Sequence, residues 1–195
     1  MTTNVPAAGA RGTVQIPTER LLEINPESTR NIPKARFYED ISQVVEGKLE
    51  LVGPTLTAYD EIHGKFKLMT SSLNDQLVTL EEREGHLKEA LDVIRGAKTR
   101  KTNTETLYKV ADCLYTRARV TEPQKCFLWL GSNVMMEYTP EEAEAVVGKN
   151  LATTKENIED ILENILALRS ETTVIEASIS RLHNYGVYLR KQHNV

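Results

Sequence analysis

Two series of apolar residues at a spacing of seven, one in each half of the chain, constrain its fold more than any other feature. The first series is Tyr59, Phe66, Leu73, Leu80, Leu87 and Ile94. The second series is Val147, Thr154, Ile161, Leu168, Ile175, Leu182 and Leu189, followed four residues later in each repeat by Leu151, Ile158, Ile165, Thr172 and Ile179. A repeat of about 3.5 residues keeps one apolar stripe of a helix facing a partner helix. The pattern therefore predicts two coiled-coil arms, which form rods and tethers more often than catalytic clefts.

The two arms are expected to pair with each other. The remaining seam positions of the first arm are less apolar, and they are His63, Thr70, Leu77, Glu84, Leu91 and Lys98. A helix with a single apolar stripe needs a strongly apolar partner, which the second arm supplies. With roughly fifty residues in each arm and a rise of about 1.5 Å per residue, the chain would form an antiparallel hairpin on the order of 75 Å long.

The start of the second arm is marked by a helix-capping sequence. Thr139 offers a capping hydroxyl, Pro140 suits the first helical position, and Glu142 stands three residues after the cap to complete a capping box. Near the first arm, a short helix or helix start between Ile32 and Glu50 is expected to lead into the arm, with Pro54 in its first turn.

The segment between the arms is predicted to form two β-hairpins. Alternating apolar residues indicate strands, and the expected strands are Leu107 to Ala111, Leu114 to Val120, Cys126 to Leu130 and Val134 to Tyr138. Such a small patch of strands leaves an apolar face uncovered and its edges open to another chain. We therefore predict subunit assembly through a shared sheet or barrel. The candidate assembly residues are Leu114, Ala118, Val120, Phe127, Leu128, Trp129, Leu130, Val134, Met136 and Tyr138.

These features divide the chain into a predicted series of segments. They are a flexible N-terminal tail at 1–30, a main domain at 31–190 and a C-terminal tail at 191–195; the domain contains the first arm at about 36–98, the hairpins at 105–138 and the second arm at 140–190. The fold class is mainly α with a small β part.

Charge and composition exclude several classes of partner. Both arms are acidic, whereas binding a polyanion requires Lys and Arg to displace its counterions, so we expect no nucleic acid. Arg117 and Arg119 of the basic middle segment alternate with apolar residues, as the solvated face of a strand would. No apolar run approaches the roughly eighteen residues that span a bilayer, and the N-terminus lacks a signal peptide's apolar region. We expect a soluble cytoplasmic protein with no membrane partner and with Cys113 and Cys126 as free thiols.

The sequence offers no pattern typical of catalysis or of a cofactor. The four histidines lack a paired metal-ligand spacing on one helix face. Cys113 has no evident histidine partner that would make it a nucleophile, and Gly131-Ser132-Asn133 is better suited to a β-turn than to a phosphate loop. We therefore predict a protein that is not an enzyme and holds no metal or cofactor.

The arrangement of arm, two hairpins and arm resembles that of α-class prefoldin subunits, and several local stretches are similar as well. The matching stretches are Ile32 to Asp40, Leu114 to Ala118, Cys126 to Tyr138, Glu141 to Ala143 and Ser180 to Tyr185. The motif of the second hairpin is the most specific of them. The chain departs from the family at Asn31, where glycine is usual, and at Tyr185-Gly186, where Trp-Asp is usual.

The resemblance implies a cochaperone of six subunits, with one further α-type and four β-type subunits as partners. Their hairpins would join into a β-barrel platform from which six coiled coils project. Such a complex captures unfolded or newly made proteins, actin and tubulin among them, and delivers them to the chaperonin CCT without hydrolysing nucleotide. The alternative for a chain of this shape is a structural adaptor or cytoskeletal tether that binds folded partners along an arm.

Client binding is expected at the open ends of the arms, because antiparallel pairing brings the start of the first arm to the end of the second. The apolar side chains available there are Phe37, Ile41, Val44, Val45, Tyr185, Tyr188 and Leu189. The alternative is that these side chains simply close the end of the coiled coil, and Leu189, which continues the heptad series, is the strongest candidate for that role.

Overall fold

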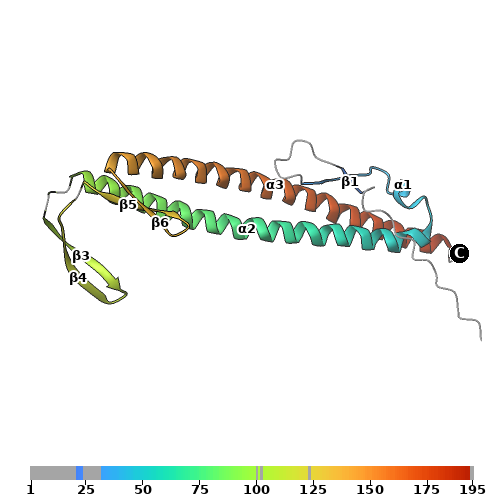
Figure 1. Ribbon diagram of the computed structural model, residues 1–195. Coiled ribbons are helices and arrows are strands. Elements are labelled where there is room, and N and C mark those ends of the chain that lie inside the picture. Colours follow the sequence, from blue (N-terminus) through green and yellow to red (C-terminus); the bar gives the residue numbers. More distant parts are fainter. Residues whose placement is uncertain (1–20, 24–31, 100, 102, 123, 194–195) are drawn as a thin grey trace, which may run out of the picture. The chain divides into compact units, whose positions relative to one another are not determined.

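The computed structural model describes residues 21–23, 32–99, 101, 103–122 and 124–193. The chain divides into two compact units, of which the first contains the described residues up to Asn74 together with those from Leu162 onward, and the second contains Asp75–Ile161. Two long helices, α2 (Leu49–Thr99) and α3 (Pro140–His193), contribute to both units (Figure 1). The predicted class, mainly α with small antiparallel hairpins, is confirmed.

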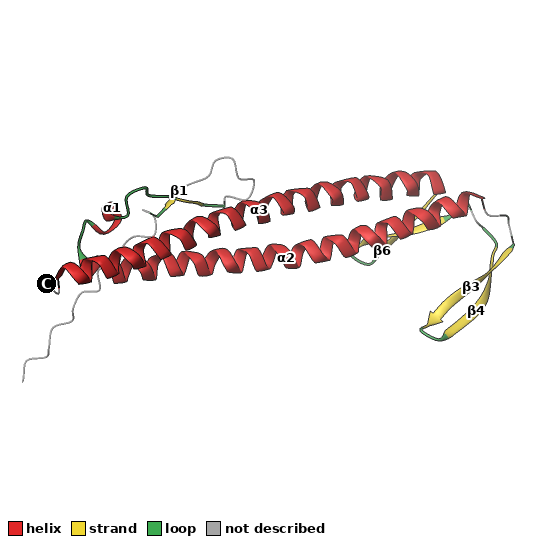
Figure 2. Cartoon of the chain, turned by 180° about the vertical axis from the view of Figure 1, so that it is seen from behind, coloured by secondary structure: helices red, strands yellow, loops and turns green. Residues whose placement is uncertain are grey.

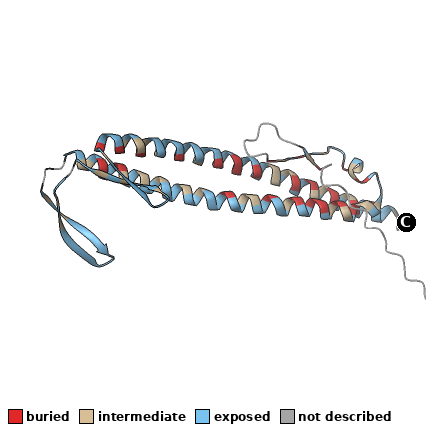
Figure 3. Ribbon diagram, in the orientation of Figure 1, coloured by how far each residue is buried: buried red, intermediate tan, exposed pale blue. Residues whose placement is uncertain are grey.

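The heptad series forms the buried seam of the first unit. Tyr59 and Phe66 of α2 are almost completely buried, as are Leu168, Ile175 and Leu182 of α3. Figure 3 shows the buried positions on the sides of the two helices that face each other. The helices run antiparallel, because His63 of α2 bonds to Glu176 of α3 while the earlier Val52 lies against the later Gly186.

The contact at Gly186 gives a structural reason for a glycine inside α3. A Cβ atom added to Gly186 would lie 2.9 Å from Cγ1 of Val52, which is closer than two carbon atoms can approach. Gly186 and Val52 are both buried. The absence of a side chain at residue 186 therefore lets the two helices come together.

A short helix precedes the first long helix. Residues Ser42–Val45 form the short helix α1, and the chain then turns through Glu46 and Gly47, both with positive φ, before α2 begins at Leu49. Glycine adopts such a conformation freely, so Gly47 separates the two helices. Pro54 consequently lies at the sixth residue of α2 and not in its first turn.

Part of the predicted N-terminal tail is paired with the main domain. Strands β1 (Leu22–Glu23) and β2 (Lys34–Ala35) are antiparallel, and the N–H of Arg36 donates to the carbonyl oxygen of Leu21 at 3.0 Å. The side chain of Leu21 is buried. The rest of the predicted tail lies outside the described residues.

The second unit contains the two predicted hairpins. Strand β3 (Thr104–Ala111) pairs with β4 (Leu114–Val120), and β5 (Cys126–Gly131) pairs with β6 (Val134–Tyr138) (Figure 2). Each hairpin has an irregularity just before its turn, between Lys109 and Ala111 in one and between Trp129 and Gly131 in the other.

Helix α3 starts with the predicted capping box. The N–H of Glu142 donates to Oγ1 of Thr139 at 3.3 Å, and the N–H of Thr139 donates to the Glu142 carboxylate at 3.0 Å. The hydrogen bonds that the backbone N–H and the hydroxyl of Thr139 donate to the Glu142 carboxylate lower the pKa of Glu142. Two of the backbone donors that a helix start leaves unpaired are thereby satisfied.

Candidate functional site

The two hairpins of the second unit expose an unusual amount of apolar surface. The exposed large apolar side chains are Leu107, Tyr108, Val110, Leu114 and Tyr115 in β3–β4, and Phe127, Trp129, Leu130, Val134, Met135 and Met136 in β5–β6. A two-stranded hairpin is marginally stable by itself, and a large exposed apolar patch is typical of a protein–protein interface. Within the described residues each hairpin also has free outer edges, since no further strand pairs with it.

The hairpin β5–β6 is apolar on both faces. Its inner side chains Cys126, Leu128 and Tyr138 pack against a buried cluster of the helices, formed by Leu91, Ile94, Ala143 and Val147. Its outer side chains include Phe127 and Trp129, which are 59% and 60% exposed. One face is thus covered by the chain's own helices and the other is available to a second chain.

The predicted assembly residues divide accordingly. Leu114, Phe127, Trp129, Leu130, Val134 and Met136 are exposed, whereas Ala118, Val120, Leu128 and Tyr138 are partly buried. Sequence reasoning did not include the exposed residues Leu107, Tyr108, Val110, Tyr115 and Met135. The signal that could have identified them is that both faces of these strands carry large apolar residues, as in Leu107-Tyr108, Leu114-Tyr115 and Val134-Met135-Met136.

A short groove runs between α2 and β5 in the second unit. Its volume is about 450 Å³, and it is lined by Ala90, Val93, Ile94, Phe127 and Leu128 with polar residues at its rim. The groove is the outer margin of the contact between the helices and the hairpin.

Ion pairs connect the two helices next to the hairpins. The Glu144 carboxylate accepts hydrogen bonds from Nε of Arg95 at 2.9 Å and from Nζ of Lys98. Both cations lower the pKa of Glu144, with Lys98 the larger cause. Because these groups are exposed to solvent, the pairs favour one arrangement of the helix ends more than they stabilise the fold.

The predicted client-binding residues lie together in the first unit, but they differ in accessibility. Phe37 and Tyr188 are 53% and 54% exposed, and Val44 and Tyr185 are partly buried. Ile41, Val45 and Leu189 are buried. In this structure the last three side chains close the end of the helix pair, and Phe37 and Tyr188 present the most accessible surface.

Residues 32–45, which we term the strap, lie along α3 (Figures 1 and 2). The N–H of Ala35 donates to Oε2 of Glu171 at 2.7 Å. The Arg181 guanidinium donates to the carbonyl oxygens of Tyr38, at 2.7 Å, and of Glu39. The same guanidinium lies 5.0 Å from the centre of the Phe37 ring.

A stripe of aromatic residues continues from Arg181 toward the end of α3. Tyr185 and Tyr188 follow Arg181 at helical spacings of four and seven, so the three share one face of the helix. The rings of Tyr185 and Tyr188 stack with centroids 6.2 Å apart, and the Gln192 amide donates to the Tyr188 hydroxyl at 2.7 Å.

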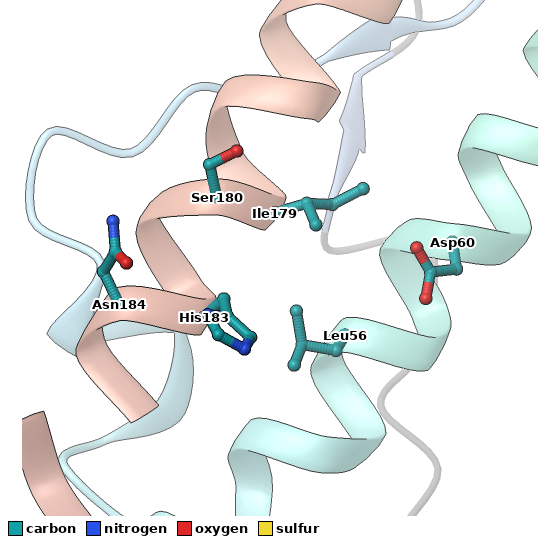
Figure 4. Close-up of a pocket in the computed structure, with 6 residues that line it drawn as sticks. All are labelled: Leu56, Asp60, Ile179, Ser180, His183 and Asn184. Atoms are coloured by element: carbon teal, nitrogen blue, oxygen red, sulfur yellow. The ribbon is translucent and has the colours of Figure 1, made fainter. Parts of the chain in front are cut away.

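A second depression lies between α2 and α3 in the first unit (Figure 4). It encloses about 460 Å³ and is lined by Leu56 and Asp60 of α2 and by Ile179, Ser180, His183 and Asn184 of α3.

Among the described residues no group of three or more His, Cys, Asp and Glu side chains is placed to hold a metal ion. In the same part of the chain, no helix combines the length and apolar character needed to cross a membrane.

Two long paired helices, with two exposed apolar hairpins between them in the chain, are the features of a subunit of a larger assembly. The comparison with protein families leads to the same class of protein. The family model described as prefoldin subunit matches residues 66–185, and the chain belongs to this family.

The similar curated proteins support subunit 3 within that family. Prefoldin subunit 3 of Mus musculus is 33% identical over 165 residues, which cover 83% of this chain and 84% of the relative. The probable prefoldin subunit 3 of Schizosaccharomyces pombe is 32% identical over 164 residues, covering 84% of this chain and 95% of the relative. Among solved structures, a chain of filamentous prefoldin from Methanocaldococcus jannaschii is similar with a TM-score of 0.42 and 20% identity, covering 64% of this chain and 97% of that chain. The predicted resemblance to prefoldin is thus confirmed.

Proposed function

We propose that this chain is an α-type subunit of a heterohexameric prefoldin, together with one further α-type subunit and four β-type subunits. The complex captures unfolded or nascent proteins such as actin and tubulin at the ends of its helical arms. It passes them to the chaperonin CCT in the cytoplasm without using ATP. Neither nucleic acid nor a membrane is a partner in this function.

The exposed apolar surface of the hairpins carries the assembly part of the proposal. Phe127 and Trp129 are more than half exposed and are not among the side chains packed against the buried cluster of the helices, so burying each ring against another subunit would contribute up to about 3 kcal/mol. Free strand edges add backbone donors and acceptors that another subunit can pair. Both features favour a shared sheet or barrel.

The end of the helix pair supports client capture. Phe37 and Tyr188 expose aromatic surface there. Weak contacts of this kind suit a chaperone, because several arms acting together raise the overall affinity for a client without any single tight site.

The decisive experiment is native mass spectrometry of the complex purified from its own cells. A mixed hexamer that suppresses aggregation of chemically denatured proteins is expected. A homodimer that binds one folded partner would refute the proposal and favour the adaptor alternative.

A variant tests the assembly surface directly. Phe127→Asp together with Trp129→Asp should remove this chain from the hexamer while its helical circular dichroism persists. Leu68→Asp is a matched control, since Leu68 is 74% exposed on α2 and lies in the other unit.

A further inference from the structure

Three hydrogen bonds between the strap and α3 use backbone atoms of the strap. Glu171 accepts a hydrogen bond from the peptide N–H of Ala35, and Arg181 donates to the peptide oxygens of two consecutive residues, Tyr38 and Glu39. Every polypeptide offers these groups whatever its sequence. These three hydrogen bonds therefore do not depend on the residue types of the strap, whereas its buried side chains add apolar packing at Ile32, Ala35, Ile41 and Val45.

The spacing of Glu171 and Arg181 matches an extended segment. Ten residues of helix separate them, which corresponds to about 15 Å along its axis. From Ala35 to Tyr38 and Glu39 the strap advances three to four residues, or about 10–13 Å at about 3.3 Å per extended residue, which agrees with the helix distance to within a few ångströms. Residues 36–40 of the strap are neither helix nor strand.

The side chain of Phe37 adds a contact that makes few steric demands. The Phe37 ring lies over the Arg181 guanidinium and remains about half exposed. A guanidinium stacks on any aromatic face, so other aromatic residues could take the place of Phe37. Tyr185 and Tyr188 extend the same helix face with further aromatic surface.

We infer that Glu171 and Arg181 form a binding site for an extended segment of unfolded polypeptide, and that the strap occupies this site as an intramolecular substitute for a client. The inference rests on the proposed function, which it deepens by naming the residues and the mode of recognition. A client that binds here must displace the strap. The strap therefore lowers the apparent client affinity by the fraction of time during which it covers the site.

This inference separates two kinds of substitution that break the same intramolecular contact. Weakening the strap should uncover the site and tighten client binding. Changing Arg181 should remove the site itself and weaken client binding, although the strap is released in that case too. If the contact served only to hold the fold together, both substitutions would act in the same direction.

The test uses the complete assembly with substitutions in this chain alone. The probe is a fluorescently labelled, reduced and carboxymethylated polypeptide that remains unfolded, and its dissociation constant is measured by anisotropy. Phe37→Ala should tighten binding about two- to fivefold, the range of a partly exposed cation–π contact. Ala35→Pro, which removes the N–H donated to Glu171, should act in the same direction.

Substitutions on α3 should have the opposite effect. Arg181→Gln should weaken binding by about tenfold through the loss of charged hydrogen bonds. Arg181→Lys keeps the charge but loses the planar fork that reaches two carbonyl oxygens, so weaker binding is expected again. Arg169→Gln is the matched control, because Arg169 is exposed on the same helix twelve residues earlier, and no change is expected.

Circular dichroism and native mass spectrometry check that each variant folds and assembles. If Arg181→Gln does not fold or assemble, the binding measured with Arg181→Lys tests the inference in its place. The inference would be overturned if the strap variants and the Arg181 variants changed the dissociation constant in the same direction, or did not change it, while the unsubstituted complex bound the probe normally. Failure of the unsubstituted complex to bind the unfolded probe would instead refute the proposed function.

Discussion

Replacing Gly186 with alanine should destabilise the end of the helix pair, although alanine is normally the better helix former. Gly→Ala inside a helix gains about 1 kcal/mol from helix propensity. Here the new Cβ would lie 2.9 Å from Cγ1 of Val52. Val52 is buried, and a β-branched side chain in a helix has one strongly preferred rotamer, so it cannot move aside easily. Overpacking of this kind costs about 1–3 kcal/mol, which leaves a net loss of about 1 kcal/mol.

The sign should reverse when Val52 is shortened. In a Val52→Ala background the clashing methyl group is gone, so Gly186→Ala should then stabilise the helix pair by about 1 kcal/mol. The two backgrounds together give a coupling free energy of about 2 kcal/mol between the two positions.

Native-state hydrogen exchange of the assembled complex measures these local changes. The informative peptides cover residues 49–62 and 178–193, where the opening free energy of the helix ends is read directly. Val52→Ala alone provides the reference for its own cavity. Stabilisation by Gly186→Ala in both backgrounds would show that propensity alone acts there and that the close approach of the helices is not real.

Two further predictions concern the second unit. Thr139→Ala should lower the opening free energy at the start of α3 by about 1 kcal/mol, whereas Thr139→Ser should keep the cap; equal exchange in both variants would contradict the capping role. The pKa of Glu144 is lowered from its usual 4.5 by Lys98 and Arg95, so its contribution to stability is complete above pH 4.5 and is lost as the pH falls through its lower folded-state value. The opening free energy near the start of α3, taken from exchange rates corrected for the slower intrinsic amide exchange at low pH, should therefore fall below pH 4.5 more in the natural chain than in Glu144→Gln, and identical pH profiles would refute this contribution.

The features that could be predicted from the sequence are those that depend on neighbouring residues or on a strict repeat. The seam series of Phe66 and Leu182 is buried as expected, since a period of seven fixes which helix face is apolar. The cap of Thr139 and Glu142 and the strands of both hairpins follow from local patterns in the same way. Each of these signals lies within a few residues of the structure that it determines.

The strap could not be predicted because its contacts join distant parts of the chain. Ala35 and Glu171 are separated by 136 positions, and Tyr38 and Arg181 by 143. No periodicity links them, and the interaction uses the backbone of one partner, which leaves no trace in its residue types. In the sequence, the stretch Ile32 to Asp40 contributes only to the family resemblance, because no local pattern gives a structural reason for it.

The same long-range contacts change the physical meaning of the predicted client-binding residues. From the sequence, Val45 and Phe37 are both apolar side chains near the end of an arm, and nothing distinguishes them. In the structure Val45 is fully buried while the Phe37 ring lies over a guanidinium that also holds the strap backbone. In the proposed mechanism a buried side chain meets a client only after the strap moves, whereas the half-exposed Phe37 is accessible beforehand. Accessibility, set by packing between residues far apart in the sequence, therefore separates the proposed client-binding residues in a way that the sequence does not show.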